Sequence, residues 1–380
     1  MKIALFDWTV EGHHSRYVRR FSEVLGPRAN LIVAVPEEIS PEVSDLPVKY
    51  FPLGSKRPRP DSSQSLSDQN RELAITEVDL FERVVEEVRP DHIIHMCADP
   101  IIRRMVYRPT YNVPVTLCIF HPRAHYFASY RSLLPPGELM RAWFQEYLVM
   151  RWRQRLDAYA IFTLDQEAVR RWSLRKGAPA FYLPEPPLEA IADLPAFRER
   201  SGCIIYGYLF AQKGIGRLRR AVAQCPSPIR VILAGNADPT YQPALMSHIS
   251  AMHGSGATID LRCWQHNEHE GLAALAEARC AVLPYIRHYG MSRVLLEASV
   301  AGTPVIAHNF GLLGHLVEKH GIGEVVDCSN PRAFSKVLNK FCSDEGLIQS
   351  YSNSLSRFAD NFSRSVFERA ILAPWPELSY

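Results

Sequence analysis

The sequence lacks the features that define several classes of protein. Its eight cysteines stand singly among 380 residues, with no CxxC pair and no tight Cys/His cluster, which argues against a zinc site or a disulfide framework. No apolar run reaches the ~18–20 residues of a membrane span. The net charge of +3 is too small to indicate nucleic-acid binding by itself. What remains is a globular protein whose reduced cysteines favour the cytoplasm.

Two further absences restrict the types of reaction that the chain is expected to catalyse. The chain contains no Asp-x-Asp motif, so a metal bound through such a motif is not expected. It also shows no convincing pair of carboxylates for glycoside hydrolysis. The first residues hold an apolar run of about five, whereas the core of a signal peptide needs ~7–15. That run predicts a buried first strand instead.

Short apolar runs alternate with helical patterns along the whole chain. Strands are predicted at 2–6, 31–35, 48–51, 92–96, 113–120, 159–163, 203–206, 229–234, 258–262, 281–284 and 305–307. Helices are predicted at 15–25, 72–88, 139–156, 165–176, 216–224, 243–253, 270–279 and 292–301. Residues 55–70 are polar and rich in proline and serine, and they predict a loop. Strands that alternate with helices indicate parallel sheets covered on both faces, an α/β fold.

The length of the chain predicts two domains, because 380 residues exceed one ordinary core. We expect doubly wound, Rossmann-like domains at 1–185 and 199–360, joined by a proline-rich linker at 186–198. Residues 361–380 are expected to return to the first domain. Two such domains bind ligands beyond the carboxyl ends of their strands, which predicts a site in a central cleft.

The second half carries residues suited to a nucleoside diphosphate sugar. Residues 207–214 (GYLFAQKG) supply a glycine turn, Lys213 and a helix start, a combination that can hold a diphosphate. Gly235 ends the next predicted strand, where a glycine allows a ligand to approach closely. Residues 289–305 (YGMSRVLLEASVAGTPV) place Glu297 one turn inside a helix, where a carboxylate can hold ribose hydroxyls. The alternative for Lys213 is an ordinary surface lysine, and the alternative for Gly235 is an ordinary turn.

These segments resemble, in order and spacing, the C-terminal half of retaining GT-B glycosyltransferases of the family 4 type. The likeness rests on GYLFAQKGIGRL, then ILAG, then PYIRHYGMSRVLLEASVAGTPVIAHNFGLLGHLV. Typical members carry Gly-Arg…Glu-Lys-Gly after the first strand of that domain, and a Glu, seven residues, Glu motif that runs into an Ala-Gly-x-Pro-Val strand. The likeness covers about 150 residues, roughly 200 to 345. The first half matches more loosely, through a glycine turn and a VPVTLCIFH strand that ends in histidine.

The resemblance implies roles for residues at matching positions. Glu297 would hold the ribose hydroxyls and Lys213 the diphosphate, and Gly12 would approach the diphosphate from the other domain. His121 would lie at the reaction centre, where it would hydrogen-bond the donor sugar and orient it. The implied catalytic residues are His121, Lys213 and Glu297. The implied donor-binding residues are Gly12, Gly207, Tyr208, Lys213, Gly235, Tyr289, Gly290, Met291, Ser292, Arg293 and Glu297.

Two residues depart from the family pattern. Tyr289 stands where the first glutamate of the motif would fall, and Tyr208 stands where an arginine would lie beside the diphosphate. The second change removes a positive charge that would stabilise the leaving group, an effect of about 2.7–4 kcal/mol. Arg287, His288 or Arg293 could supply that charge, and a solvated basic loop is the alternative.

Other features are open to two interpretations. His13 and His14, in the first turn, are candidates for contact with the acceptor or phosphate, with a simple turn as the alternative; His95, Asp99 and His125 are further candidates. Helix 139–156 carries aromatic and arginine residues. That composition fits a helix that packs on the core with a solvated basic face. The alternative is a peripheral contact with the inner, anionic face of a membrane.

The sequence therefore predicts a cytoplasmic, retaining, metal-independent glycosyltransferase that needs no cofactor. It would move a sugar from a nucleoside diphosphate sugar to a hydroxyl of a glycan, lipid-linked or small-molecule acceptor. The alternatives are a two-domain nucleotide-sugar epimerase and a degenerate transferase that binds without catalysis.

Overall fold

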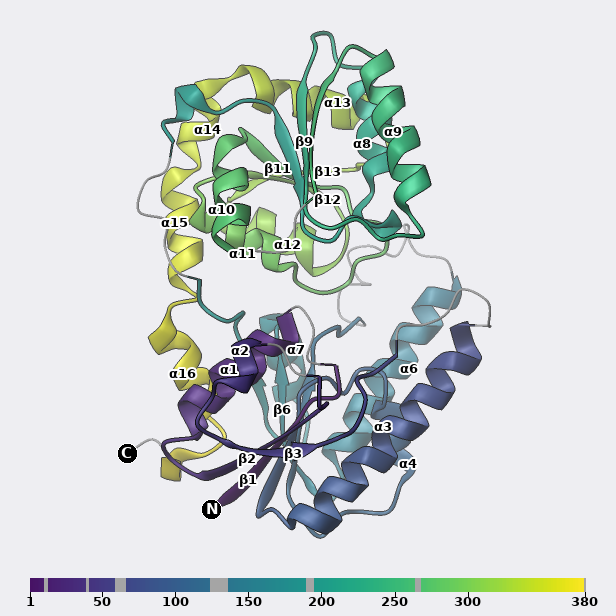
Figure 1. The fold of residues 1–380 in the computed structure, drawn as a ribbon, viewed down its shortest axis with the longest axis vertical. Helices are drawn as coiled ribbons and strands as arrows, with labels where there is room; N and C mark the ends of the chain where they lie inside the picture. Colours follow the sequence, from purple (N-terminus) through teal and green to yellow (C-terminus); the bar gives the residue numbers. More distant parts are fainter. Residues whose placement is uncertain are drawn as a thin grey trace. The chain divides into compact units, whose positions relative to one another are not determined.

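The chain folds into two compact units. The computed structural model describes residues 1–9, 13–38, 41–58, 66–123, 136–188, 195–263 and 268–378. Unit 1 comprises Met1–Pro186 together with Arg364–Tyr380, and unit 2 comprises Pro187–Ser363 (Figure 1). None of the described helices has the length and apolar content needed to cross a bilayer.

Unit 1 is built on a seven-stranded parallel sheet. Its strand order is β3-β2-β1-β4-β5-β6-β7. The strands are β1 (Lys2–Phe6), β2 (Asn30–Val35), β3 (Lys49–Pro52), β4 (His92–His95), β5 (Val115–Ile119), β6 (Ala158–Thr163) and β7 (Ala180–Tyr182). The helices are α1 (His13–Leu25), α2 (Pro41–Ser44), α3 (Leu66–Val88), α4 (Ile102–Tyr107), α6 (Pro136–Arg153), α7 (Gln166–Ser173) and α16 (Arg364–Leu372). Figure 1 shows α3, α4 and α6 on one side of this sheet, and α1 and α16 on the other.

Unit 2 is built on a six-stranded parallel sheet. Its strand order is β10-β9-β8-β11-β12-β13. The strands are β8 (Cys203–Tyr206), β9 (Arg230–Ala234), β10 (Thr258–Arg262), β11 (Cys280–Leu283), β12 (Val305–His308) and β13 (Gly323–Val326). The helices are α8 (Ile215–Val222), α9 (Gln242–Gly254), α10 (Glu268–Glu277), α11 (Arg293–Val300), α12 (Gly311–His320), α13 (Pro331–Ser343), α14 (Glu345–Ser350) and α15 (Ser352–Asp360).

Both sheets reverse their strand order once. The reversal falls between β1 and β4 in unit 1, and between β8 and β11 in unit 2. At such a point the connections on either side of the sheet diverge, which leaves a crevice beyond the carboxyl ends of the two strands. Apart from Lys2 at the start of β1, the residues of β1, β8 and β11 are buried, as a sheet covered on both faces requires. The predicted α/β fold with two doubly wound parallel sheets is confirmed.

The last residues of the chain complete the core of unit 1. Trp375 is 1% exposed, and its ring lies 5.0 Å from that of His92 in β4. Tyr159 in β6 donates a hydrogen bond from Oη to the carbonyl of Pro374, at 2.6 Å. On the same side of the sheet, Phe367 of α16 packs edge-on against Phe21 of α1, at 6.4 Å, and Phe162 of β6 contacts both Phe21 and Trp375. Residues that are distant in sequence therefore close this side of the sheet.

Two sequence-based predictions are wrong in detail. The polar loop predicted over 55–70 ends early, because α3 begins at Leu66; residues 59–65 lie outside the described part of the chain. The basic face predicted for helix 139–156 is only partly solvated. Arg153 of α6 is 2% exposed, and its guanidinium donates to the carbonyls of Ala178 and Trp172, each at 2.7 Å. This arginine holds α6 to α7 and to the segment that leads into β7.

Candidate functional site

Turns at the carboxyl ends of β8 and β11 meet at the reversal point of unit 2. The amide of Ile286 donates to the carbonyl of Gln212, at 2.9 Å. Gly214, in the turn after β8, has a left-handed conformation with φ of 74°. A Cβ at this position would lie 2.1 Å from the carbonyl oxygen of Pro284, in the turn after β11. Only glycine permits this packing. Arg217, in the first turn of α8, donates to the Tyr285 carbonyl at 2.8 Å and fixes the same pair of turns.

Lys213 is the charged centre of this junction. Its Nζ donates to Tyr285 Oη at 2.7 Å and to the Tyr206 carbonyl at 3.0 Å. The residue is 9% exposed, so little bulk water screens its charge. Nζ also lies 4.6 Å from the centre of the Tyr285 ring. The lysine predicted to hold a diphosphate is therefore fixed in place at the strand ends.

The tyrosine hydroxyl links Lys213 to the start of α11. Tyr285 Oη lies 3.4 Å from Ser292 Oγ. Ser292 precedes α11 in an extended conformation, and its hydroxyl makes no capping bond to the helix. The N–H groups of the first turn of a helix have no partner within the helix, so they suit an anion. Lys213 and the beginning of α11 thus flank one place at the carboxyl edge of the sheet.

Glu297 lies inside α11, one turn after Arg293. Its side chain is 5% exposed, and Oε1 lies 3.3 Å from Arg293 Nε. Arg293 also donates from Nη2 to Glu268 Oε2, at 3.3 Å. Arg293 therefore divides its charge between two carboxylates. Arg287, by contrast, is exposed in a left-handed turn with φ of 51°.

The two tyrosines that depart from the family pattern are anchored by neighbours in unit 2. Tyr208 Oη donates to Asp238 Oδ2 at 3.3 Å. The Tyr289 ring packs edge-on against Phe310 at 5.2 Å, and its carbonyl accepts from the Leu312 amide at 3.3 Å. Residues 288–289 are thereby attached to the turn between β12 and α12.

The other predicted donor-site residues complete the same edge. Gly235 follows β9 with φ of 121°, and a Cβ there would lie 2.2 Å from the carbonyl oxygen of Gly207. It is therefore needed for the contact between two turns. Gly290 and Met291 are buried in the turn before α11. Unit 2 brings together Gly207, Tyr208, Lys213, Gly235, Tyr289, Gly290, Met291, Ser292, Arg293 and Glu297. Sequence reasoning missed Tyr285 and Arg217, because only the packing of the two turns reveals their contacts.

In unit 1, His121 follows β5 and is fixed through its backbone. Its amide donates to Asp99 Oδ1 at 2.9 Å, and the amide of Phe120 donates to Asp99 Oδ2 at 2.8 Å. Gln145 donates from Nε2 to the His121 carbonyl, at 3.1 Å. The imidazole is 46% exposed, and its Nδ1 lies 3.9 Å from Asp99 Oδ1. Asp99 therefore positions the histidine at the strand end.

Some of the other candidate residues in the N-terminal half lie outside the described part of the chain. Gly12 and His125 lie outside the described residues, and the side chain of His13 is not described. His14 is buried in α1, and its Nδ1 lies 2.9 Å from Asp7 Oδ2. Burial lowers the pKa of His14, but the Asp7 carboxylate raises it by more, so the net shift is upward. His95, at the end of β4, is fully buried, and burial lowers its pKa to about 3.

A buried glutamate lies beside these histidines, at the reversal point of unit 1. Glu77 of α3 is 1% exposed; its Oε2 accepts from Arg57, and its Oε1 lies 3.5 Å from His95 Nε2. Burial raises the pKa of Glu77 to about 7. The carboxyl group thus keeps its proton in the folded chain at pH values where an unfolded chain has lost it.

Glu77→Gln is expected to flatten the dependence of stability on pH between about 4.5 and 7. In the unchanged protein stability falls as pH rises through this window, because the unfolded state releases a proton that the folded state keeps. The difference is on the order of 3 kcal/mol, from a pKa raised to about 7. Urea denaturation at several pH values measures it. Glu86→Gln, at an exposed site on the same helix, is the control, and parallel curves for all three proteins would contradict the prediction.

Among the residues that the structure describes, no group of three or more His, Cys, Asp or Glu side chains is placed to hold a metal ion. Metal independence stays a prediction.

Comparisons with known proteins agree with this geometry. Residues 190–361 match the family model "Glycosyl transferases group 1". A D-inositol 3-phosphate glycosyltransferase of Salinispora arenicola (strain CNS-205) is 33% identical over 134 residues, which are 33% of this chain and 30% of that protein. The chain therefore matches less than a third of the length of this relative. The matched family segment contains every residue of unit 2 that was predicted to bind the donor.

Solved structures cover nearly the whole chain. WaaG, a glycosyltransferase involved in lipopolysaccharide biosynthesis, has a TM-score of 0.65 at 14% identity and covers 99% of this chain and 100% of its own. Anabaena Alr3699/HepE, solved with UDP and glucose, has a TM-score of 0.64 at 15% identity and covers 98% of each chain. The fold of the chain is GT-B.

Proposed function

From the premise that residues 190–361 form a glycosyl transferases group 1 domain, we propose that the chain transfers a sugar from a nucleoside diphosphate sugar. The acceptor would be a hydroxyl of a glycan, a lipid-linked molecule or a small molecule. One observation carries the proposal. Lys213, Tyr285 and Ser292 form a continuous polar chain at the reversal point of unit 2, beside a helix that holds the buried Glu297.

Each part of this site suits one part of the donor. The diphosphate is anionic, and it would lie between Lys213 Nζ and the first N–H groups of α11. Glu297 would accept hydrogen bonds from the two ribose hydroxyls, since a carboxylate can accept from both at once. Arg293, 3.3 Å from Glu297 Oε1, holds that carboxylate in its orientation. Anabaena Alr3699/HepE, solved with UDP and glucose, supports a donor of this class.

The proposed reaction retains the configuration of the transferred sugar. The acceptor oxygen bonds to the anomeric carbon on the face that the nucleoside diphosphate leaves, while the bond from that carbon to the phosphate oxygen breaks. The departing phosphate oxygen takes the acceptor proton. Lys213 and the α11 N–H groups would stabilise the negative charge that grows on the leaving group. The step requires no metal; His121 would orient the donor sugar.

A thermal-shift screen with UDP-, GDP-, ADP- and TDP-sugars tests the donor class. A cognate ligand at about 100 times its Kd should add about 2.7 kcal/mol to the free energy of unfolding. NMR of the product's anomeric proton then tests retention. Because all eight cysteines are free, the screen is best run under the reducing conditions that we propose for its compartment, the cytoplasm.

Glu297→Gln is expected to weaken binding of the cognate nucleotide by about 10- to 100-fold. A hydrogen bond to a charged group contributes about 1.5–3 kcal/mol, and the amide can accept at only one of the two positions. Isothermal titration with the nucleoside diphosphate measures this loss. Glu318→Gln, at an exposed position on α12, is the control. Equal affinity in the three proteins would remove Glu297 from the donor site.

A protein that binds the donor without turnover is the second candidate. The observation that favours it is the pair of tyrosines, Tyr208 and Tyr289, where the family carries an arginine and a glutamate. Binding of a nucleotide sugar without transfer to any acceptor and without hydrolysis would select it. Turnover of the donor by the purified chain would exclude it.

A further inference from the structure

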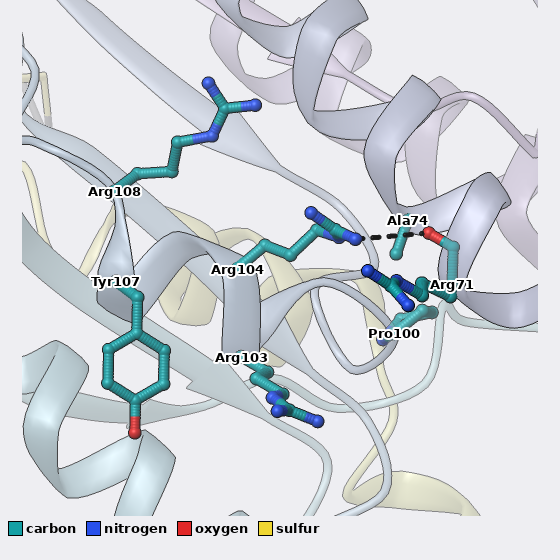
Figure 2. Close-up of a pocket in the computed structure, with 7 residues that line it drawn as sticks. All are labelled: Arg71, Ala74, Pro100, Arg103, Arg104, Tyr107 and Arg108. Atoms are coloured by element: carbon teal, nitrogen blue, oxygen red, sulfur yellow. Dashed lines mark hydrogen bonds between the residues drawn. The ribbon is translucent and has the colours of Figure 1, made fainter. Parts of the chain in front are cut away.

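Unit 1 carries a second concave site on its helical layer. A cavity of about 670 Å³ lies between α3 and α4 (Figure 2). Of the seven described residues that line it, four are arginines and none is acidic. They are Arg71 of α3, Arg103 and Arg104 of α4, and Arg108 immediately after α4. Figure 2 shows Arg71 and Arg104 close together with Arg103 nearby, while Arg108 and Tyr107 lie further along the wall.

The positive charge of this arginine cavity is only partly neutralised. Arg108 forms two ion pairs with carboxylates of α3. Its Nη2 lies 3.0 Å from Asp79 Oδ1, and its Nη1 lies 2.9 Å from Glu82 Oε2. Arg71, Arg103 and Arg104 have no ion pair within the described part of the chain. Arg104 Nη2 donates instead to the Arg71 carbonyl, at 3.5 Å. Like charges held around one cavity repel each other, so an anion in it would be stabilised by several guanidinium groups at once.

The surface beside the cavity is apolar and aromatic. The Arg103 guanidinium lies 5.8 Å from the centre of the Phe144 ring in α6. Trp143, Phe144 and Tyr147 of α6 are 50%, 44% and 48% exposed, which is high for aromatic side chains. Tyr107, on the cavity wall, is 63% exposed. A cationic cavity with an aromatic border suits an anion that is attached to a less polar group.

We propose that the arginine cavity is a binding site for a phosphate group, separate from the donor site of unit 2. A phosphate presents three or more acceptor oxygens, and the planar fork of each arginine can donate two hydrogen bonds to it. Three guanidinium groups that have no carboxylate partner among the described residues match that demand better than they match a single carboxylate. The phosphate can belong to a soluble molecule or to a lipid headgroup, and the same arginines would hold either.

The test uses the full chain and the double variant R103Q/R104Q. R170Q is the matched control, because Arg170 lies on α7 of the same unit, with a side chain that is 76% exposed. In the first arm inorganic pyrophosphate is titrated into each protein. In the second arm each protein is sedimented with phosphatidylcholine vesicles with and without phosphatidylglycerol. Thermal unfolding verifies that each variant is folded; Arg103 is exposed and Arg104 is only half-buried, so their loss should not unfold unit 1.

The double variant is expected to lose about 100-fold in affinity in at least one arm, about tenfold for each arginine removed. A loss in the pyrophosphate arm identifies a soluble phosphate, and a loss confined to vesicles with phosphatidylglycerol identifies a lipid headgroup. R170Q should bind like the unchanged protein. The proposal is overturned if the double variant equals R170Q in both arms, or if the unchanged protein binds neither probe. Binding that the double variant retains in the pyrophosphate arm belongs to the donor site.

Discussion

Replacing Lys213 by methionine is expected to lower kcat/KM for sugar transfer by about 100- to 1,000-fold. The reason is electrostatic. The leaving diphosphate gains negative charge in the transition state, and a fixed, buried cation there contributes about 2.7–4 kcal/mol. Methionine has a similar length but cannot supply the charge. Steady-state kinetics with the cognate donor measures the loss.

A control substitution at a second lysine distinguishes the loss of leaving-group stabilisation from a general change in the charge of the protein. Lys336→Met removes an exposed lysine from α13 of the same unit, and it should leave kcat/KM unchanged. Lys213 also bonds to the Tyr206 carbonyl and to Tyr285, so its removal is expected to lower the melting temperature slightly. If the variant lost stability but kept full activity after correction for the folded fraction, Lys213 would be a structural residue only.

The second large effect is on stability. Gly235→Ala is expected to destabilise unit 2 by about 3 kcal/mol, because two costs add. A non-glycine residue is strained at φ of 121°, and its Cβ would lie 2.2 Å from the carbonyl oxygen of Gly207. For a unit of this size the melting temperature should fall by about 6–12 °C. Differential scanning calorimetry measures it.

Substitutions at two other glycines distinguish backbone strain from the steric clash of an added Cβ. Gly256 has φ of 84° with no atom within 4 Å of an added Cβ, so Gly256→Ala should cost only the strain, about 1 kcal/mol. Gly254, near the end of α9, has neither problem, so Gly254→Ala should be neutral or slightly stabilising. If Gly235→Ala cost no more than Gly256→Ala, the contact between the β8 and β9 turns would not matter to unit 2.

The architecture could be predicted because local patterns determine it. Apolar runs at 203–206 and 229–234 coincide with β8 and β9, since strands inside a sheet covered on both faces are largely apolar. No element after β12 was predicted, although α12 has 10 residues and α13 has 13, and several short elements before it were also missed. The helix α4, of six residues, and the strand β7, of three, are too short to show a period. The strand β13 is half-buried along its length and lacks the apolar run of a central strand.

The site was predictable as a set of positions but not as a network. The glycines and Glu297 follow from a motif with fixed spacing. Tyr285 was missed because its role depends on Lys213, 72 positions away in the chain, reaching its hydroxyl. The role of Arg293 was also incomplete, because the sequence does not show that Glu268 shares its charge. Contacts between turns from different strands appear only when the sheet is assembled.

The return of Arg364–Tyr380 to unit 1 determines the order in which the protein can be completed. Trp375, Phe367 and Ile371, all buried, are synthesised only after the whole of unit 2. Until then the growing chain carries a first unit whose sheet is uncovered where these side chains will pack. Unit 2 lies entirely between the two parts and can finish earlier. Folding during synthesis is therefore expected to run against the order of the sequence, with the middle of the chain maturing before its beginning.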